Sequence, residues 1–171
     1  MNALPNLVKP GLKILFVGIN PGLKSAEIGH HFGGRSNRFW RFLADSSLTP
    51  FKFDATCDHR LLDFGYGITN IVPRPTTSAS ELSRREFEDG AVILLSLIRK
   101  FQPCIAAYLG KDIYFHLHKR KDLKWGKQDH QAAPPVVDFI LPNPSGLNRM
   151  PIPEQLQYYQ ELQVLVSKFS N

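Results

Sequence analysis

Four short runs of apolar, partly β-branched residues stand out along the chain, because polar positions do not alternate with apolar ones inside them. They cover residues 12–19, 67–72, 104–109 and 136–141. Strands that are apolar throughout are typical of a parallel sheet whose two faces are both covered. Pro73 and Pro75 directly follow the second run, and proline cannot continue a central ladder. The pattern therefore predicts four buried strands.

Helical periodicity is found between these runs. The clearest helix follows Ser83, because Glu86 completes a capping box and apolar residues then recur at helical spacing as far as Ile98. Further helices are predicted over residues 37–44, 111–118 and 153–169. Ser36 is the predicted N-cap of the first of these three. Residues 23–36, rich in Gly, His and Ser, are predicted to form an irregular loop.

Alternating strands and helices predict an α/β fold, a three-layer sandwich around a mainly parallel, four-stranded central sheet. The sequence contains no internal repeat, low-complexity tract or linker, so residues 1–171 are expected to form a single domain. No apolar run approaches the roughly 20 residues of a membrane-spanning helix, and the first residues lack the apolar core of a signal peptide. We therefore expect no membrane association and a protein that stays in the compartment where it is made.

Two loops follow the first and fourth predicted strands, GINPG at residues 18–22 and NPSGLNR at residues 143–149. In parallel sheets ligands bind beyond the carboxyl ends of the strands, so both loops are predicted to border one cleft. Taken singly, each loop also fits a simple turn, in which Asn20 satisfies local backbone groups. Their placement on the same edge of one sheet favours a functional site.

The charge balance indicates a class of partner. Lys and Arg number 21 against 15 Asp and Glu, which gives a net charge of +6. Such a balance favours a polyanionic partner, because basic side chains neutralise phosphates. Cys57 and Cys104 are the only cysteines, and two isolated thiols cannot complete the ligand set of a structural zinc site or an iron–sulfur cluster. No metal site and no cofactor are expected.

Several short motifs share one further property, their order and spacing. They are GINPG at residues 18–22, LKSAEIGHHF at 23–32, NRFW at 37–40, GITNIVPRPT at 67–76, LGK at 109–111, WGKQ at 125–128 and LPNPSGLNR at 141–149. In this order they resemble the mismatch-specific uracil and thymine DNA glycosylases, within the uracil-DNA glycosylase superfamily. The resemblance covers roughly residues 12–165, and the short chain is similar to bacterial members.

The resemblance implies a uracil-DNA glycosylase-like fold and a monofunctional DNA glycosylase of base excision repair. Such an enzyme hydrolyses the N-glycosidic bond of a flipped uracil and leaves an abasic site. Asn20 matches the residue that holds the attacking water. The implied base pocket comprises Gly18, Ile19, Ser25, His31, Phe32 and Asn70. In it Phe32 stacks on the base, and the backbone amides of Ile19 and Phe32 read the uracil edge.

For two of these positions the residue also fits a different role. Phe32 also fits an ordinary core aromatic. His31, like its neighbour His30, fits either a phosphate contact or a merely exposed side chain.

The resemblance assigns the second loop to DNA binding. The residues concerned are Asn143, Ser145, Gly146, Leu147, Asn148 and Arg149. Gly146, Leu147 and Arg149 match a wedge that fills the gap in the base stack and addresses the widowed guanine. Asn143 matches a contact to the reaction centre or a nearby phosphate. For Leu147, ordinary core packing is the alternative.

The implied partner is double-stranded DNA containing uracil mismatches, with G·U preferred, and single-stranded uracil DNA is a further candidate. We expect a monomer in the bacterial cytoplasm, associated with the nucleoid through DNA. Removal of thymine, ethenocytosine or hypoxanthine stays open, since one methyl group is discriminated by only about 10- to 200-fold. Asn70 departs from the family pattern, in which bacterial members often carry a basic residue. It predicts activity on uracil that depends less on the mismatch.

Two other classes of protein are alternatives to a glycosylase. One is a nonenzymatic nucleic-acid-binding domain that keeps the cleft but not the cutting, and Asn20 argues against it. The other is an α/β nucleotide-binding enzyme. GINPG lacks the lysine and hydroxyl of a P-loop and the spacing of a dinucleotide fingerprint.

Overall fold

The computed structural model describes residues 2–169 and is organised around one five-stranded sheet. The strands are β1 (Ile14–Gly18), β2 (Tyr66–Asn70), β3 (Ile105–Leu109), β4 (Gly126–Lys127) and β5 (Val137–Leu141), in the order β2-β1-β3-β5-β4. β1 pairs in parallel with β2 and β3, β3 pairs in parallel with β5, and β4 is antiparallel to β5. The carboxyl ends of the four parallel strands therefore meet at one edge of the sheet.

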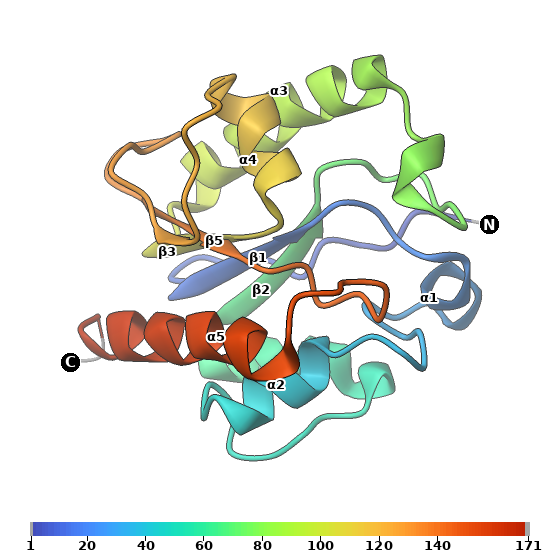
Figure 1. The fold of residues 1–171 in the computed structure, drawn as a ribbon, viewed down its shortest axis with the longest axis horizontal. Helices are drawn as coiled ribbons and strands as arrows, with labels where there is room; N and C mark the ends of the chain where they lie inside the picture. The colour runs from blue at the N-terminus through green and yellow to red at the C-terminus, as the bar shows by residue number, and fades with distance from the viewer. Residues whose placement is uncertain (1, 170–171) are drawn as a thin grey trace.

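Helices cover both faces of this sheet (Figure 1). One face carries α3 (Arg84–Phe101) and α4 (Lys111–His118), and the other carries α2 (Phe39–Asp45) and α5 (Ile152–Ser167). The remaining helices are α1 (Leu23–Ile28) and the 3-10 helices η1 (Ala55–Phe64) and η2 (Ala79–Glu81). The predicted three-layer α/β sandwich with a mainly parallel sheet is confirmed.

The number of strands differs from the prediction, which was four. The four predicted runs fall on β1, β2, β3 and β5, and the additional strand is β4. It pairs Gly126 with Ile140 and Lys127 with Phe139. Two residues are too few to show a hydrophobic period, so the sequence pattern gives no sign of such a strand.

Two local predictions on either side of residue 36 were wrong. Residues 23–28 form α1 rather than loop, a helix whose six residues are too few to show a hydrophobic period. At α2 the N-cap is Arg38, one residue before Phe39, so Ser36 does not cap the helix. The N–H of Phe39 has no acceptor within the helix. It donates instead to Oδ1 of Asn37 at 2.9 Å.

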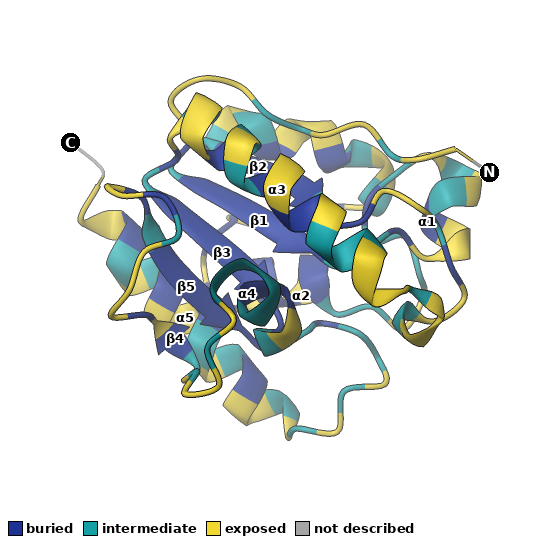
Figure 2. Cartoon of the chain, turned by 90° about the horizontal axis from the view of Figure 1, so that it is seen from above, coloured by how far each residue is buried: buried dark blue, intermediate teal, exposed yellow. Residues whose placement is uncertain are grey.

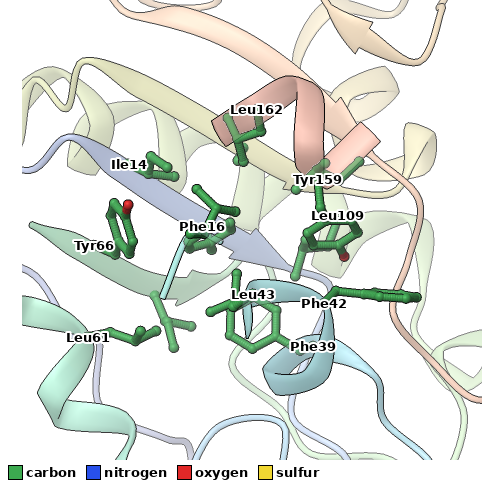
Figure 3. Packing of buried hydrophobic residues seen from close by; sticks show 14 of the residues in the cluster. Ile14, Phe16, Phe39, Phe42, Leu43, Leu61, Tyr66, Leu109, Tyr159 and Leu162 are labelled. Atoms are coloured by element: carbon green, nitrogen blue, oxygen red, sulfur yellow. The ribbon is translucent and has the colours of Figure 1, made fainter. Parts of the chain in front are cut away.

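β1 is buried along its whole length, and its side chains alternate between two apolar cores. Ile14 and Phe16 face α2 and α5, where the ring of Phe16 meets Phe39 edge to face with centroids 5.2 Å apart (Figure 3). Leu15 and Val17 face α3 and α4. Because both faces of β1 are packed, the loop that follows it starts from a fixed position.

The start of α3 confirms the predicted capping box. Oγ of Ser83 accepts from the N–H of Glu86 at 3.2 Å, and the Glu86 carboxylate accepts from the N–H of Ser83 at 2.8 Å. α3 turns a buried side toward the sheet and an exposed side toward solvent (Figure 2). No helix within residues 2–169 combines the length and the apolar character that crossing a bilayer requires.

Candidate active site

A cleft of about 520 Å³ lies where the parallel strands β1, β2, β3 and β5 end. Most of the predicted site residues line it, namely Gly18, Ile19, Asn20, Ser25, His31, Phe32, Asn70, Asn143, Ser145, Gly146 and Leu147. Asn148 and Arg149, which follow Leu147 in the chain, do not line it. The loops after β1 and β5, far apart in the sequence, thus border the same space.

Asn20 lines the cleft and holds its carboxamide in one orientation. Nδ2 donates to the backbone oxygen of Arg74 at 2.8 Å and to Oγ1 of Thr76 at 2.7 Å. A backbone oxygen can only accept, so the atom that faces Arg74 is the NH₂ group. Oδ1 receives no hydrogen bond from any residue between 2 and 169. This oxygen is therefore able to accept a hydrogen bond from a water molecule.

Arg74, which orients Asn20 through its backbone, is itself fixed through its side chain. Nε and Nη2 donate to the two carboxylate oxygens of Glu86 at 2.6 and 3.1 Å, and Nη2 donates to the backbone oxygen of Glu81 at 3.1 Å. The hydrogen bonds from Arg74 and from the backbone of Ser83 lower the pKa of Glu86 to about 2. That carboxylate therefore stays charged at neutral pH. From the start of α3 it fixes the side chain of Arg74, whose backbone oxygen orients Asn20.

Gly18 and Asn70 form part of the pocket at the ends of two neighbouring strands, where they are paired in register. A Cβ atom on Gly18 would lie 2.5 Å from Oδ1 of Asn70 and 3.7 Å from Cζ of Phe32. The first distance is too short for a real contact, so any side chain at position 18 would displace the Asn70 carboxamide. Glycine at this position lets Asn70 and Phe32 border the same pocket.

Phe32 has an unusual backbone conformation. Its φ of 53° lies in the left-handed region that residues with a side chain rarely adopt. The ring stacks on Phe39, with centroids 4.0 Å apart and planes at 29°, and meets Trp40 edge-on at 6.5 Å. Phe32 is half-buried and also lines the cleft, so it combines core packing with a place in the pocket.

Two buried side chains hold the backbone on either side of Phe32. The N–H of His31 donates to Oδ2 of Asp58 at 2.9 Å, and the N–H of Gly33 donates to Oγ of Ser25 at 2.9 Å. Both acceptors are buried, with 4% of Asp58 and 5% of Ser25 exposed. Strained backbone persists where its surroundings over-determine it, and these two bonds have that effect here.

His31 is part of the framework beneath the pocket. Only 2% of it is exposed, and its Nε2 donates to the backbone oxygen of Pro5 at 2.9 Å. Desolvation lowers the pKa of His31, against the opposing effects of Pro5 and Asp58. The expectation of an exposed side chain is wrong for His31. His30 is half-buried, and its Nδ1 lies 3.0 Å from Oδ1 of Asp58.

The loop after β5, residues 143–149, is held by its own polar groups. Oδ1 of Asn143 accepts from the N–H of Ser145 at 2.9 Å, and the Asn143 backbone oxygen accepts from Nδ2 of Asn148 at 2.9 Å. Leu147 projects from this framework with 87% of its surface exposed. The core-packing alternative for Leu147 is therefore wrong. Arg149 is exposed as well.

The sequence did not single out Arg74, Thr76 or Asp58. Arg74 and Thr76 lie inside the GITNIVPRPT motif, so the motif was a signal, although it does not show which side chains turn toward Asn20. Asp58 lies in η1, a helix that the periodicity did not predict. No sequence signal connects it with Phe32.

These groups together suit a flat, polar ring and a water molecule. Among residues 2–169, the N–H groups of Ile19 and Phe32 have no protein acceptor, and both residues line the cleft. Two donors, one aromatic ring and the free oxygen of Asn20 thus share one space. Within the same range, no three His, Cys, Asp or Glu side chains are grouped as a metal site requires.

Comparison with known proteins shows the family to which the chain belongs. The sequence profile of the uracil DNA glycosylase superfamily matches residues 5–163. The chain belongs to the uracil DNA glycosylase superfamily. Membership supports DNA glycosylase activity, with DNA as the partner.

A solved structure is similar to this chain over nearly the whole length of both proteins. It is the solution NMR structure of a protein from Methanosarcina acetivorans that is assigned as a uracil DNA glycosylase. The two structures agree with a TM-score of 0.64 over 97% of this chain and 98% of the other, at 14% sequence identity. At that identity the likeness shows a common fold.

Proposed function

We propose that this superfamily member is a monofunctional DNA glycosylase of the mismatch-specific, bacterial type. It hydrolyses the N-glycosidic bond of a uracil flipped out of DNA, with G·U mismatches preferred, and leaves an abasic site. The observation that carries the proposal is the carboxamide of Asn20. Its NH₂ group is fixed by Arg74 and Thr76, so its oxygen is presented beside a pocket that has free N–H donors.

The base must first leave the helix. Extrusion costs a few kcal/mol and is easiest at a mismatch, which favours G·U over paired A·U. Leu147 is exposed at the rim of the cleft and enters the gap in the base stack as an apolar wedge. Arg149, exposed beside it, supplies hydrogen bonds to the widowed guanine or charge to a phosphate.

The extruded uracil then lies against Phe32. Stacking of a base on an aromatic ring contributes about 1 to 3 kcal/mol. The N–H groups of Ile19 and Phe32 donate to the carbonyl oxygens of uracil, which gain negative charge as the bond to the sugar breaks. The pocket thereby binds the leaving group more strongly as the reaction proceeds.

Water attacks C1′ of the deoxyribose, the electron pair of the C1′–N1 bond leaves with the uracil, and the proton that the water loses passes to the solvent or to the uracil anion. Asn20 is neutral and takes no proton, so it acts by holding the water in line through Oδ1. An amide is a weaker promoter of this attack than a carboxylate. The proposal therefore includes a modest chemical rate and a heavy reliance on stabilisation of the leaving group.

Asn70 extends the proposal to the choice of substrate. Its carboxamide lies against Gly18 in the pocket, where a neutral amide can bond directly to the uracil edge. We therefore include A·U pairs and single-stranded uracil DNA among the substrates, acted on by a monomer. Removal of thymine or ethenocytosine depends on the same pocket and is tested with the same assay.

A strand-nicking assay on a G·U duplex tests the function. The parent protein is expected to excise uracil, and Asn20→Ala is expected to lose on the order of 100- to 1,000-fold in rate, because a preorganised polar group is removed. Binding to the same duplex is measured alongside and is expected to persist in the variant. Binding without excision by the parent would instead identify a nonenzymatic DNA-binding domain.

A further inference from the structure

Arg38 connects the two walls of the cleft. It follows the strained segment around Phe32 and precedes α2, and it contacts the loop of residues 143–149, here called the wedge loop. Its backbone N–H donates to the backbone oxygen of Pro144 at 2.8 Å. Its guanidinium donates to the backbone oxygens of Ser145 at 3.3 Å, Asn148 at 3.4 Å and Gly146 at 3.5 Å. One residue thus serves four acceptors of the wedge loop.

The same two segments also pack closely where Gly146 meets Ser36, two residues before Arg38. A Cβ atom on Gly146 would lie 2.5 Å from Cβ of Ser36 and 2.8 Å from the backbone oxygen of Ser36. The wedge loop therefore packs against the residues before Arg38 more closely than a side chain at position 146 would allow. Leu147, directly after this contact, is the exposed apolar side chain of the loop.

The chemistry of arginine suits this position. A guanidinium is a planar fork with five N–H donors, so it can bond to several backbone oxygens at once. A lysine ammonium would reach fewer of them in a fixed geometry. The acceptors are the backbone oxygens on both sides of Leu147, so the bonds of Arg38 define the shape of the loop that presents this side chain.

We infer that Arg38 is a positioning residue, which holds the wedge loop in the shape that inserts Leu147 into DNA and couples that loop to the base pocket. This inference rests on the proposed function and adds a residue to it. The coupling follows from chain connectivity, because only the five residues 33–37 separate Phe32 from Arg38. Filling the gap and holding the base are then mechanically linked.

If Arg38 instead contacts a DNA phosphate, its removal has a different effect on DNA affinity. An arginine that merely contacts a phosphate weakens binding to every DNA sequence when it is removed, and lowers the slope of log affinity against log salt by about 1. A positioning arginine leaves the binding of undamaged duplex unchanged, because its donors already serve the wedge loop. The two roles are therefore separable by measurement.

The test compares Arg38→Met and Arg38→Lys with Arg41→Met. Arg41 lies on α2, three residues after Arg38, is exposed and, among residues 2–169, pairs only with Asp45, so its replacement removes the same charge without touching the wedge loop. Three quantities are measured for each protein. They are single-turnover excision from a G·U duplex, the salt dependence of affinity for undamaged duplex, and amide hydrogen exchange at Leu147, Asn148 and Met150.

Arg38→Met is expected to excise uracil about 10- to 100-fold more slowly, since a displacement near 1 Å can have that effect. Its affinity for undamaged duplex and the salt slope should equal those of Arg41→Met. The three amides, which bond to Ser145 and Asn148 within the loop, should exchange faster. Arg38→Lys should recover part of both losses.

Unchanged exchange at these amides in Arg38→Met overturns the inference, whatever happens to excision. A lowered salt slope with unchanged exchange assigns Arg38 to a phosphate contact instead. If the parent protein excises no uracil, the proposed function fails, and hydrogen exchange still decides whether Arg38 holds the loop.

Discussion

Asn20 and Thr76 are 56 positions apart in the sequence, yet Nδ2 of Asn20 lies 2.7 Å from Oγ1 of Thr76. Thr76 is buried, with 4% of its surface exposed, and its N–H donates to the backbone oxygen of Pro21 at 3.2 Å. The segment after β2 is thus tied to the loop after β1 at both Asn20 and Pro21. The orientation of the carboxamide depends on both strands.

Replacing Thr76 tests this dependence. Thr76→Val keeps the shape but removes the acceptor, so Asn20 retains one partner and its carboxamide can turn. Excision from a G·U duplex is expected to fall about 10- to 100-fold under single-turnover conditions, because a misplaced water reacts slowly. Thr76→Ser keeps the hydroxyl and should restore most of the rate. Equal losses in both variants would contradict the orienting role of the hydroxyl.

The contact between Gly18 and Asn70 leads to a double-mutant prediction. In Gly18→Ala the new Cβ meets Oδ1 of Asn70, which is the movable end of a side chain, so the carboxamide should swing away. Excision of uracil from A·U and single-stranded DNA should then fall, as it should in Asn70→Ala. Residues in contact show non-additive effects. The double variant is expected to be hardly worse than either single one, and fully additive losses would show that the two positions act separately.

The fold was largely predictable because its strands are buried on both faces. A strand such as β1, apolar at every position, gives a clear signal, and the capping box at Ser83 marks the start of α3 in the linear sequence. β4 and α1 gave no such signal, since a hydrophobic period needs more residues than they contain. Their existence depends on contacts to other parts of the chain.

The site was predictable only as far as chain position determines it. GINPG and NPSGLNR follow strands of one parallel sheet, so topology alone brings them to the same cleft. The partners that orient Asn20 and support Phe32 were not predictable. Thr76 and Asp58 act through side-chain directions, and these follow from tertiary packing rather than from spacing along the chain.

Asn70 is predicted to set the range of uracil contexts. Asn70→Lys places a cation where a neutral amide now lies against Gly18, and a cation in the pocket does not reproduce both the donor and the acceptor of an amide. The parent should process G·U, A·U and single-stranded uracil at rates closer to one another than the variant does. The measurement is single-turnover excision on the three substrates. Identical preferences in the two proteins would contradict the role of Asn70.

His31 predicts a loss of stability on acidification. Burial lowers its pKa from 6.5, so below that value the unfolded chain binds more protons than the folded one. The stabilisation is complete above pH 6.5 and is lost progressively as the pH falls below it. The pKa values of His116 and His118 are lowered as well, mainly by desolvation, so His31 accounts for one share of the decrease.

The contribution of His31 to this loss of stability can be isolated with His31→Gln. The side-chain amide of glutamine can still donate to Pro5 but does not titrate. Free energies of unfolding from urea titrations are compared between about pH 8 and pH 5, where histidines change charge. The variant should be less stable than the parent near pH 8 and should lose less stability on acidification. His59→Gln, at an exposed position of η1, is the matched control, because it also replaces one histidine of the chain by glutamine. Since His31 lies next to Phe32 and shares Asp58 with His30, a smaller slope in His31→Gln would also connect acid destabilisation to the segment that carries the base-stacking ring.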